Sequence, residues 1–464
     1  MTTASSLPDA AAVQELRDQL EGTLATPADA AYDALRASWN LTFDQLPAIV
    51  VEAADEDDVV AALGFAHEQR LTVAVQSTGH GAGLTCDGGL LLRTGRLREV
   101  AVDPLLRVAR IGAGARWSDV LPATAPHGLA PLLGFNAHVG VVGYTLGGGL
   151  GWLSRRHGLA VDSVRALDVV LPDATHVRVT RATEPDLFWA LRGGASNFGV
   201  VVALELELVE APALFGGLVL YPGARAAEAI AAYAEWVEGA PEEVTSSIAV
   251  IRFPPLPDVP EPLRGVTAVA IGACAQCEPA AAEALLAPLR ALPEPLADLF
   301  RPLPIEELGA IAMDPVDPMP AAGHAEVVGA LTPELQALLA ATAEGERPLV
   351  VVELRHLGGA LERPADGPIP RPAGDFLFHA ETVAPPGPAG EAARGELARL
   401  AQAIAPHVAG PPVPSFLGEL ETGPERLKRA FPAATRARLG RLKARYDPDD
   451  RFRYGRPIPA SWGG

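Results

Sequence analysis

His80 stands between glycines in the stretch VAVQSTGHGAGL, which runs from Val73 to Leu84. Residues 71–75, LTVAV, predict a short buried strand that ends just before the glycines. A neutral imidazole is a good nucleophile, and Gly79 and Gly81 allow the backbone to approach a bound group closely. A lone histidine is more often an ordinary polar residue with a hydrogen-bond partner, so the context of His80 has to decide between the two interpretations.

A second glycine-rich segment, GFNAHVGVVGYTLGGGLGWLSRRHGL, covers residues 134–159. Free backbone N–H groups in such turns can hold an anion, and a pyrophosphate fits this description. Packing of two elements is the alternative explanation, but six glycines within twelve residues favour a ligand. The segment has neither the G-x-G-x-x-G dinucleotide fingerprint nor the lysine of a P-loop, and the whole sequence contains no H-E-x-x-H. The six glycines stand at positions 140, 143, 147, 148, 149 and 151.

The surrounding pattern predicts mixed helices and strands up to about residue 210. Residues 55–70 begin with acidic residues, carry apolar residues at helical spacing and end with a basic residue, which predicts a capped amphipathic helix. The triplet Arg155, Arg156 and His157 is expected on a solvated helix face. Further strands are predicted at residues 88–92, 108–114, 165–172 and 201–209.

After residue 210, proline-rich connections separate alanine-rich helices from strands such as SIAVIRF and PLVVVELRHL. This organisation predicts a second region, a sheet covered by helices. We therefore expect a first region at residues 1–210, a second at 211–408, and a C-terminal segment, 409–464, that returns to the first.

Composition narrows the class of protein. The 464 residues carry a formal net charge of -20, which would repel nucleic acid and anionic membranes. The N-terminus shows no signal peptide and no segment is apolar for long enough to span a bilayer, so we expect a cytoplasmic protein, monomeric or homodimeric. Three cysteines, Cys86, Cys274 and Cys277, are too few for a disulfide framework, and no metal site is expected. The strong preference for arginine over lysine is typical of GC-rich bacterial coding.

Four blocks together resemble a known family. They are QSTGHGAG from Gln76, GVVGYTLGGGLGWLSRRHGLAVDSV from Gly140, DLFWALRGGASNFGVV from Asp186, and YDPDDRFRYGRPI from Tyr446. In order and spacing they are similar to the flavoproteins with a vanillyl-alcohol-oxidase (PCMH) type FAD domain, and among these to the berberine-bridge-enzyme-like oxidoreductases. The resemblance implies an α+β fold: a two-subdomain FAD-binding domain and a substrate domain of antiparallel sheet covered by helices.

The resemblance also implies how a cofactor is held. His80 matches the histidine that relatives join covalently to the flavin, and Asn136 stands where many relatives place a second, cysteinyl link. We therefore expect FAD attached through His80 alone. The other cofactor contacts that the resemblance implies are Gln76, Thr78, Gly79, Gly81, Ala82, Asn136, Gly143, Thr145, Gly148, Gly149, Gly151, Val200 and Val201.

The usual catalytic residues of the family are missing. Val413 and Ser415 stand where many relatives place a tyrosine and an asparagine over the flavin, and Gly455 replaces another asparagine. Tyr144 and Glu353 are the leading replacements for the proton acceptor. Along the predicted strand VVVELRHL, alternation places Glu353 and Arg355 on one side and Leu354 and His356 on the other. His356, Glu362 and His379 are further candidates; for each of the five, an ordinary hydrogen bond is an equally good explanation.

Two functions from different classes follow. The first is an FAD-dependent oxidoreductase, more an oxidase than a dehydrogenase, that oxidises a small organic substrate such as a sugar, an alcohol or an intermediate of bacterial secondary metabolism, with O2 as electron acceptor. The second is a flavin-binding protein with lost or redirected chemistry, for example a cyclase, which the missing tyrosine and asparagine favour.

Overall fold

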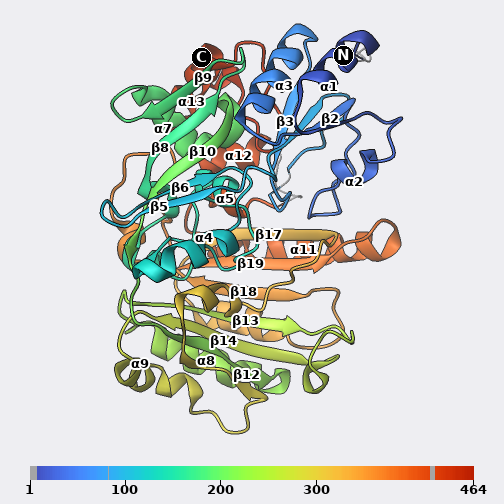
Figure 1. Ribbon diagram of the computed structural model, residues 1–464. Helices are drawn as coiled ribbons and strands as arrows, with labels where there is room; N and C mark the ends of the chain where they lie inside the picture. Colours follow the sequence, from blue (N-terminus) through green and yellow to red (C-terminus); the bar gives the residue numbers. More distant parts are fainter. Residues whose placement is uncertain (1–7, 82, 419–423) are drawn as a thin grey trace.

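A computed structural model describes residues 8–81, 83–418 and 424–464. The helix predicted after Asp55 is α3 (Glu56–Glu68), and the Asp55 carboxylate caps it by accepting a hydrogen bond from the Asp58 backbone N–H at 2.9 Å. Its apolar stripe, which includes Val59 and Leu63, is fully buried. Figure 1 shows the N-terminal sheets and α13 (Ala433–Tyr446) on one side of the molecule and a large sheet on the other.

Two sheets form the first part of the chain. A four-stranded sheet has the order β1-β2-β4-β3. Two of its three strand pairings are parallel, β2 with β4 and β4 with β3. A five-stranded antiparallel sheet has the order β5-β6-β10-β8-β9. The bounds of these strands are β1 Thr23–Ala25, β2 Ile49–Glu52, β3 Val73–Gln76, β4 Leu90–Arg93, β5 Val100–Asp103, β6 Val108–Gly112, β8 Val164–Val170, β9 His176–Thr180 and β10 Val200–Glu207.

The helices of this part include α1 (Ala10–Gln19), α4 (Trp117–Thr124), α5 (Val141–Leu146) and α7 (Pro185–Gly194). Trp152 and Trp189, which apolar patterns surround in the sequence, are buried in the core of this part. None of the helices in the described residues combines the length and the apolar character needed to cross a bilayer.

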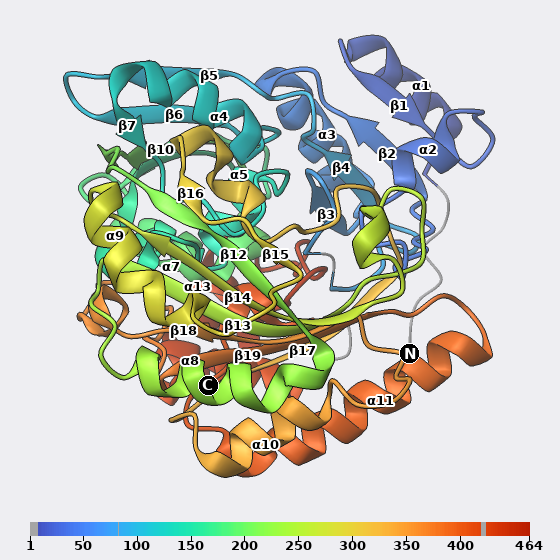
Figure 2. The ribbon, with the colours of Figure 1, turned by 90° about the horizontal axis from the view of Figure 1, so that it is seen from below.

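The second part is one antiparallel sheet of eight strands, in the order β15-β12-β14-β13-β18-β19-β17, with β16 added beside β12. Its two short strands are β15 (Ala297–Asp298) and β16 (Arg301–Pro302). Figure 2 shows α8, α10 and α11 grouped on one side of this sheet, where they share an apolar core with it. The bounds of the longer strands are β12 Phe215–Pro222, β13 Val244–Arg252, β14 Thr267–Ala275, β17 Ala321–Val328, β18 Val351–His356 and β19 Phe376–Val383, and those of the helices are α8 Ala226–Val237, α9 Pro279–Leu286, α10 Pro333–Ala341 and α11 Pro388–Ile404.

Successive residues of a strand point to opposite faces, so the two faces of this sheet differ in character. On β18, Val352 and Leu354 belong to the apolar core beneath the helices. Glu353 and Arg355 face the other way and line a cavity. The alternation read from the sequence of this strand is therefore confirmed, and it turns the polar face of the sheet toward the first part of the chain.

Arg155 corrects one expectation about the surface. Instead of lying on a solvated helix face, it is 5% exposed, and its guanidinium donates to the carbonyl oxygens of Ala240, Pro241 and Val244. Three backbone carbonyl groups compensate the charge of this guanidinium, and within the described residues Arg155 forms no ion pair with a carboxylate. Because Arg155 lies in α6 (Ser154–His157) and its acceptors lie at and just before β13, this contact ties the two parts of the chain together.

The C-terminal segment is anchored by a buried lysine. Lys443 of α13 is fully buried, and its ammonium donates to the Asp447 carboxylate at 2.7 Å, the Phe452 carbonyl at 2.7 Å and the Asn197 carbonyl at 3.1 Å. The side chain of Asn197 in turn donates to the Arg456 carbonyl at 3.0 Å. This network fixes residues 452–458 against the turn after α7.

The two lysines of the chain provide a matched test of this anchor. Lys443→Met is expected to lower the free energy of unfolding by roughly 3–5 kcal/mol, because the buried Asp447 carboxylate loses its cation. Lys428→Met, which removes only a surface pair with Glu425 at 2.7 Å, is expected to cost about 0–1 kcal/mol. Urea titration of both variants measures the difference, and equal losses would contradict the anchoring role.

Candidate functional site

A cavity of about 550 Å³ lies between the glycine-rich loops and the polar face of the large sheet. Its walls come from the loop after β3, the loop and helix at residues 134–147, the turn at 193–197, the sheet strands, and two C-terminal segments. His356 and Glu362 are absent from its described lining. The predicted residues that line it are Gln76, Thr78, Gly79, His80, Gly81, Asn136, Gly143, Tyr144, Glu353 and His379.

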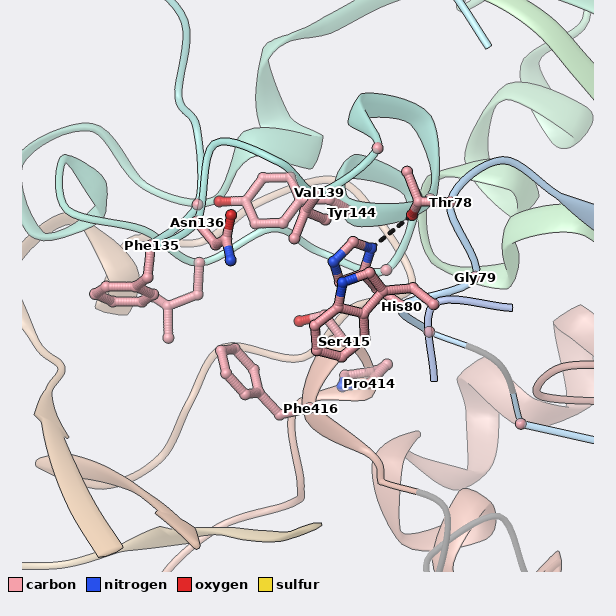
Figure 3. A pocket seen from close by; sticks show the side chains of 18 of the residues that line it. Thr78, Gly79, His80, Phe135, Asn136, Val139, Tyr144, Pro414, Ser415 and Phe416 are labelled. Carbon is pink, nitrogen blue, oxygen red and sulfur yellow. Dashed lines mark hydrogen bonds between the residues drawn. The ribbon is translucent and has the colours of Figure 1, made fainter. Parts of the chain in front are cut away.

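His80 lies at one end of this cavity. Its ring stacks on Trp39 with the centroids 4.3 Å apart and the planes 16° apart. Nδ1 lies 2.7 Å from Thr78 Oγ1 (Figure 3), whereas the buried Nε2 has no hydrogen-bond partner among the described residues. Burial, with smaller effects from Arg116 and His138, lowers the pKa of His80 to about 4. The ring is therefore neutral above this pH, the form in which imidazole is a nucleophile.

Because folding favours the neutral ring, the contribution of His80 to stability depends on pH. Between the free-histidine pKa of about 6.5 and the lowered value of about 4, the unfolded chain binds more protons at this position than the folded chain. The contribution of His80 to stability is thus present above pH 6.5 and is lost as the pH falls toward 4.

Backbone and side-chain contacts hold the His80 loop in place. The Gln76 side chain donates to the Ala37 carbonyl at 2.8 Å and accepts from Gln45 at 2.9 Å. The Thr78 carbonyl accepts from the Trp39 N–H at 3.1 Å. Gln76 therefore positions the segment that carries Trp39. Trp39 could not be predicted as a neighbour of His80, because it lies about forty residues earlier in the chain.

Several of the predicted glycines pack against protein and are absent from the described lining of the cavity. A Cβ on Gly151 would lie 1.9 Å from the Leu133 carbonyl oxygen, and one on Gly149 would lie 2.7 Å from the Tyr144 ring. Thr145, Gly148, Val200 and Val201 also lie outside that lining, and the two valines are buried in β10. Ala82 lies outside the described residues. Sequence alone does not separate glycines that meet a ligand from glycines that permit packing.

Two glycines do leave open space beside the cavity. A Cβ on Gly81 or on Gly143 would meet no atom of the described structure within 4 Å. The buried Ser77 Oγ, Tyr144 Oη and Ser415 Oγ are, within the described chain, also without hydrogen-bond partners. Polar atoms left unsatisfied around glycine-lined space are suited to a polar ligand, and Figure 3 shows His80 between Tyr144 and Ser415.

Asn136 is occupied by a local contact. Its side-chain oxygen accepts a hydrogen bond from the His138 N–H at 2.7 Å, which closes a turn. No cysteine is found among the described residues that line the cavity, and Cys86 is buried in a separate apolar cluster. Gly455, where relatives place an asparagine, has a φ of 75°, a left-handed conformation that glycine and asparagine adopt readily.

The opposite wall of the cavity is charged. Arg355 donates from Nε to Glu353 Oε1 at 2.9 Å, and its guanidinium lies 3.9 Å from the centroid of the Phe135 ring and 5.3 Å from that of Phe416. Burial raises the pKa of Glu353, but Arg355 and His379 outweigh it and the pKa falls to about 2. Burial raises the pKa of Tyr144 far above the ordinary value. At neutral pH Glu353 is therefore an anion and Tyr144 a neutral hydrogen-bond donor.

Sequence comparison points to the ligand of this cavity. Residues 47–180 match the FAD binding domain family. Over 195 residues the chain is 32% identical to (R)-6-hydroxynicotine oxidase of Paenarthrobacter nicotinovorans, which covers 42% of this chain and 43% of that protein. It is 30% identical over 241 residues to an FAD-linked oxidoreductase of Dictyostelium discoideum, and the match covers 51% of this chain and 53% of that protein. The matched sequence thus spans about half the length of these relatives.

Structural comparison extends over nearly the whole chain. The crystal structure of 6-hydroxy-D-nicotine oxidase from Arthrobacter nicotinovorans superposes with a TM-score of 0.83 at 23% identity, covering 95% of this chain and 98% of that one. Physcomitrella patens BBE-like 1 gives a TM-score of 0.80 at 17% identity, covering 96% and 99%. The chain therefore has the vanillyl-alcohol-oxidase (PCMH) type fold of FAD-binding oxidoreductases, and its α+β fold class is confirmed.

Gly79 offers a test of how the His80 loop is built. Its φ is 85°, and a Cβ there would lie 2.8 Å from the Ser38 Cα and the Trp39 backbone nitrogen. Gly79→Ala is expected to strain the loop by about 1–2 kcal/mol from the left-handed backbone alone and to displace Trp39 from His80. We expect a lower ratio of bound flavin to protein, measured by absorbance after gel filtration with added FAD.

Gly95→Ala is the matched control for this variant, because a Cβ at Gly95 would meet no described atom within 4 Å. Equal flavin content in the two variants would show that the geometry of the Gly79 turn is not required for binding.

Proposed function

We propose that this protein is an FAD-dependent oxidoreductase that oxidises a small organic molecule, such as a sugar, an alcohol or a natural-product intermediate. The observation that supports this function best is that one cavity joins the His80 loop to the charged face of the large sheet. One end offers an imidazole and glycine-lined space within the segment that matches the FAD binding domain. The other end offers ionisable groups suited to a substrate.

The residues around His80 suit FAD. Gln76, Thr78, Gly79 and Gly81 would hold it from the first loop, and Gly143 would do so from the second. Bound there, FAD would supply a two-electron acceptor for a hydride from a carbon of the substrate. We further propose that His80 forms the only covalent link, because Nε2 of the neutral ring makes no hydrogen bond within the described residues and Asn136 provides no thiol.

The remaining residues position a substrate and control its protons. The Tyr144 hydroxyl, neutral and without a partner among the described residues, can donate a hydrogen bond to a substrate oxygen. Glu353 holds a fixed negative charge against Arg355. Small residues of β13 and β14, Ala249, Ala270 and Gly272, form a flat apolar floor beside these groups. This wall accommodates an organic substrate that is neutral or positively charged and disfavours an anion.

A flavin-binding protein with redirected chemistry is the second candidate. Ser415, rather than a tyrosine or an asparagine, lines the cavity near His80, and Val413 is 6% exposed and absent from its described lining. This arrangement removes the phenol that many relatives use. The two candidates differ in one measurable property, because only an oxidoreductase loses its flavin colour when substrate is added without oxygen.

The attachment of the cofactor is tested by acid precipitation. Wild-type protein is expected to keep its yellow colour in the washed acid pellet, and His80→Ala is expected to release all colour into the supernatant, because the ring that forms the bond is gone. Absorbance near 450 nm of pellet and supernatant gives the result. A colourless wild-type pellet would leave a flavoprotein without the histidyl link.

Turnover is tested with a panel of alcohols, sugars and amines. We expect at least one compound to bleach the flavin without oxygen and to release hydrogen peroxide in air, which identifies an oxidase. Bleaching without peroxide would indicate a dehydrogenase. Flavin that no compound bleaches would support the redirected function.

A further inference from the structure

The hydrogen bond between Glu353 and His379 has no role in the function described so far. The two residues are direct neighbours across β18 and β19, and both side chains line the cavity. Their side chains meet, with His379 Nδ1 3.0 Å from Glu353 Oε1. We propose, on the basis of the function above, that His379 accepts a proton from the substrate and that Glu353 is its positioning residue.

The tautomer of His379 follows from the state of Glu353. The low pKa of Glu353, about 2, means that its carboxylate is ionised and can only accept hydrogen bonds. His379 Nδ1 must therefore carry the hydrogen that it donates to Glu353. The lone pair of the neutral ring is then on Nε2, and Arg355 prevents Glu353 from turning away.

The Nε2 side of the ring faces small residues. Gly323 lies beside it on β17, where an added Cβ would be 3.7 Å from Nε2, and Ala325 is the direct neighbour of His379 on that strand. Within the described chain, no hydrogen bond is made by Nε2. The edge of the ring meets Phe416, with the centroids 5.8 Å apart, and Phe416 lies next to Ser415 at the His80 end of the cavity (Figure 3).

The charges around His379 favour its role as an acceptor. Glu353 and Arg355 face it from β18, Glu381 from its own strand, and Asp314 from the loop before β17. Burial raises the pKa of Asp314 and of Glu381, so the Glu353 carboxylate in contact with Nδ1 is the anion that stabilises the imidazolium that forms. Asp314 and Glu381 also line the cavity.

Neither leading candidate from the sequence is as good an acceptor. Glu353 is too weak a base, because its pKa is about 2, and Tyr144 holds its proton tightly because burial raises its pKa. A general base needs a free lone pair within reach of the substrate, and the Nδ1–H tautomer of His379 keeps one on Nε2.

The proposed proton transfer runs from the substrate to His379. An O–H or N–H bond of the substrate, on the atom attached to the oxidised carbon, breaks and leaves its electron pair on that atom. The proton forms a new bond with His379 Nε2. The ring becomes an imidazolium, whose Nδ1–H remains bonded to Glu353. The inferred substrate class is thus an alcohol or amine that carries hydrogen on both the oxidised carbon and its heteroatom.

The first test needs no substrate. Long-range 15N NMR of the imidazoles in the FAD-loaded protein, with the His379 signal assigned by its loss in His379→Asn, reports the tautomer at pH 9. We expect the Nδ1–H form. An Nε2–H tautomer, or a ring still doubly protonated, would overturn the proposal, since Nε2 would then have no lone pair to accept a proton.

The second test uses a compound that bleaches the flavin in the panel above. His379→Ala is expected to lower kcat by about 10²–10⁴ fold, to lose the acid limb of the pH profile, and to recover part of its rate with added imidazole. His356→Asn is the control, because His356 follows Arg355 on β18 but points away from the cavity. It is expected to keep the wild-type profile and to show no effect of imidazole.

The outcomes separate the two proposals. A panel without any active compound contradicts the oxidoreductase function and leaves the NMR result to decide the geometry of the pair. An active compound with a normal rate and pH profile in His379→Ala keeps the oxidoreductase and overturns the role of His379. Flavin content of each variant shows whether it has folded.

Discussion

The geometry of the cavity depends on the contacts that the guanidinium of Arg355 makes. This group lies on the Phe135 ring from the first part of the chain, near the Phe416 ring from the C-terminal segment, and against Glu353 on its own strand. One buried cation thus joins three regions that are distant in sequence. A cation held over aromatic faces and bonded to a carboxylate is well compensated for its loss of water, and this explains why a charged wall can stand inside the protein.

The two ends of the cavity illustrate two ways of using burial. At one end, burial and neighbouring positive charge keep His80 neutral. At the other, a cation keeps Glu353 ionised in spite of burial. The neighbouring charge is positive at both ends. It adds to burial in keeping the basic imidazole neutral, and it outweighs burial in keeping the acidic carboxyl group ionised.

Sequence patterns predicted the features that are local along the chain. The cap of α3, the alternation on β18 and the place of His80 beside a strand end depend on neighbouring residues only. Trp39, Asp314 and Glu381 could not be predicted as wall residues, because their place depends on contacts between distant segments. Arg155 was misplaced for the same reason, since its carbonyl acceptors lie about 85 residues further along. The glycines of the second loop look alike in sequence, yet Gly151 permits close packing on the Leu133 carbonyl and Gly149 on the Tyr144 ring, whereas Gly143 leaves open space.

The buried lysine network has a consequence for how the protein is made. Lys443 fixes residues that bear Gly455 and Arg456 against the turn at Asn197, and these residues complete the wall of the cavity. During synthesis, about 250 residues must emerge between that turn and its closing segment, which takes the ribosome on the order of tens of seconds. Until then the glycine loops face solvent with one wall missing. The wall of the cavity is therefore completed only at the end of synthesis, and a chain truncated before α13 would lack the lysine that holds this wall in place.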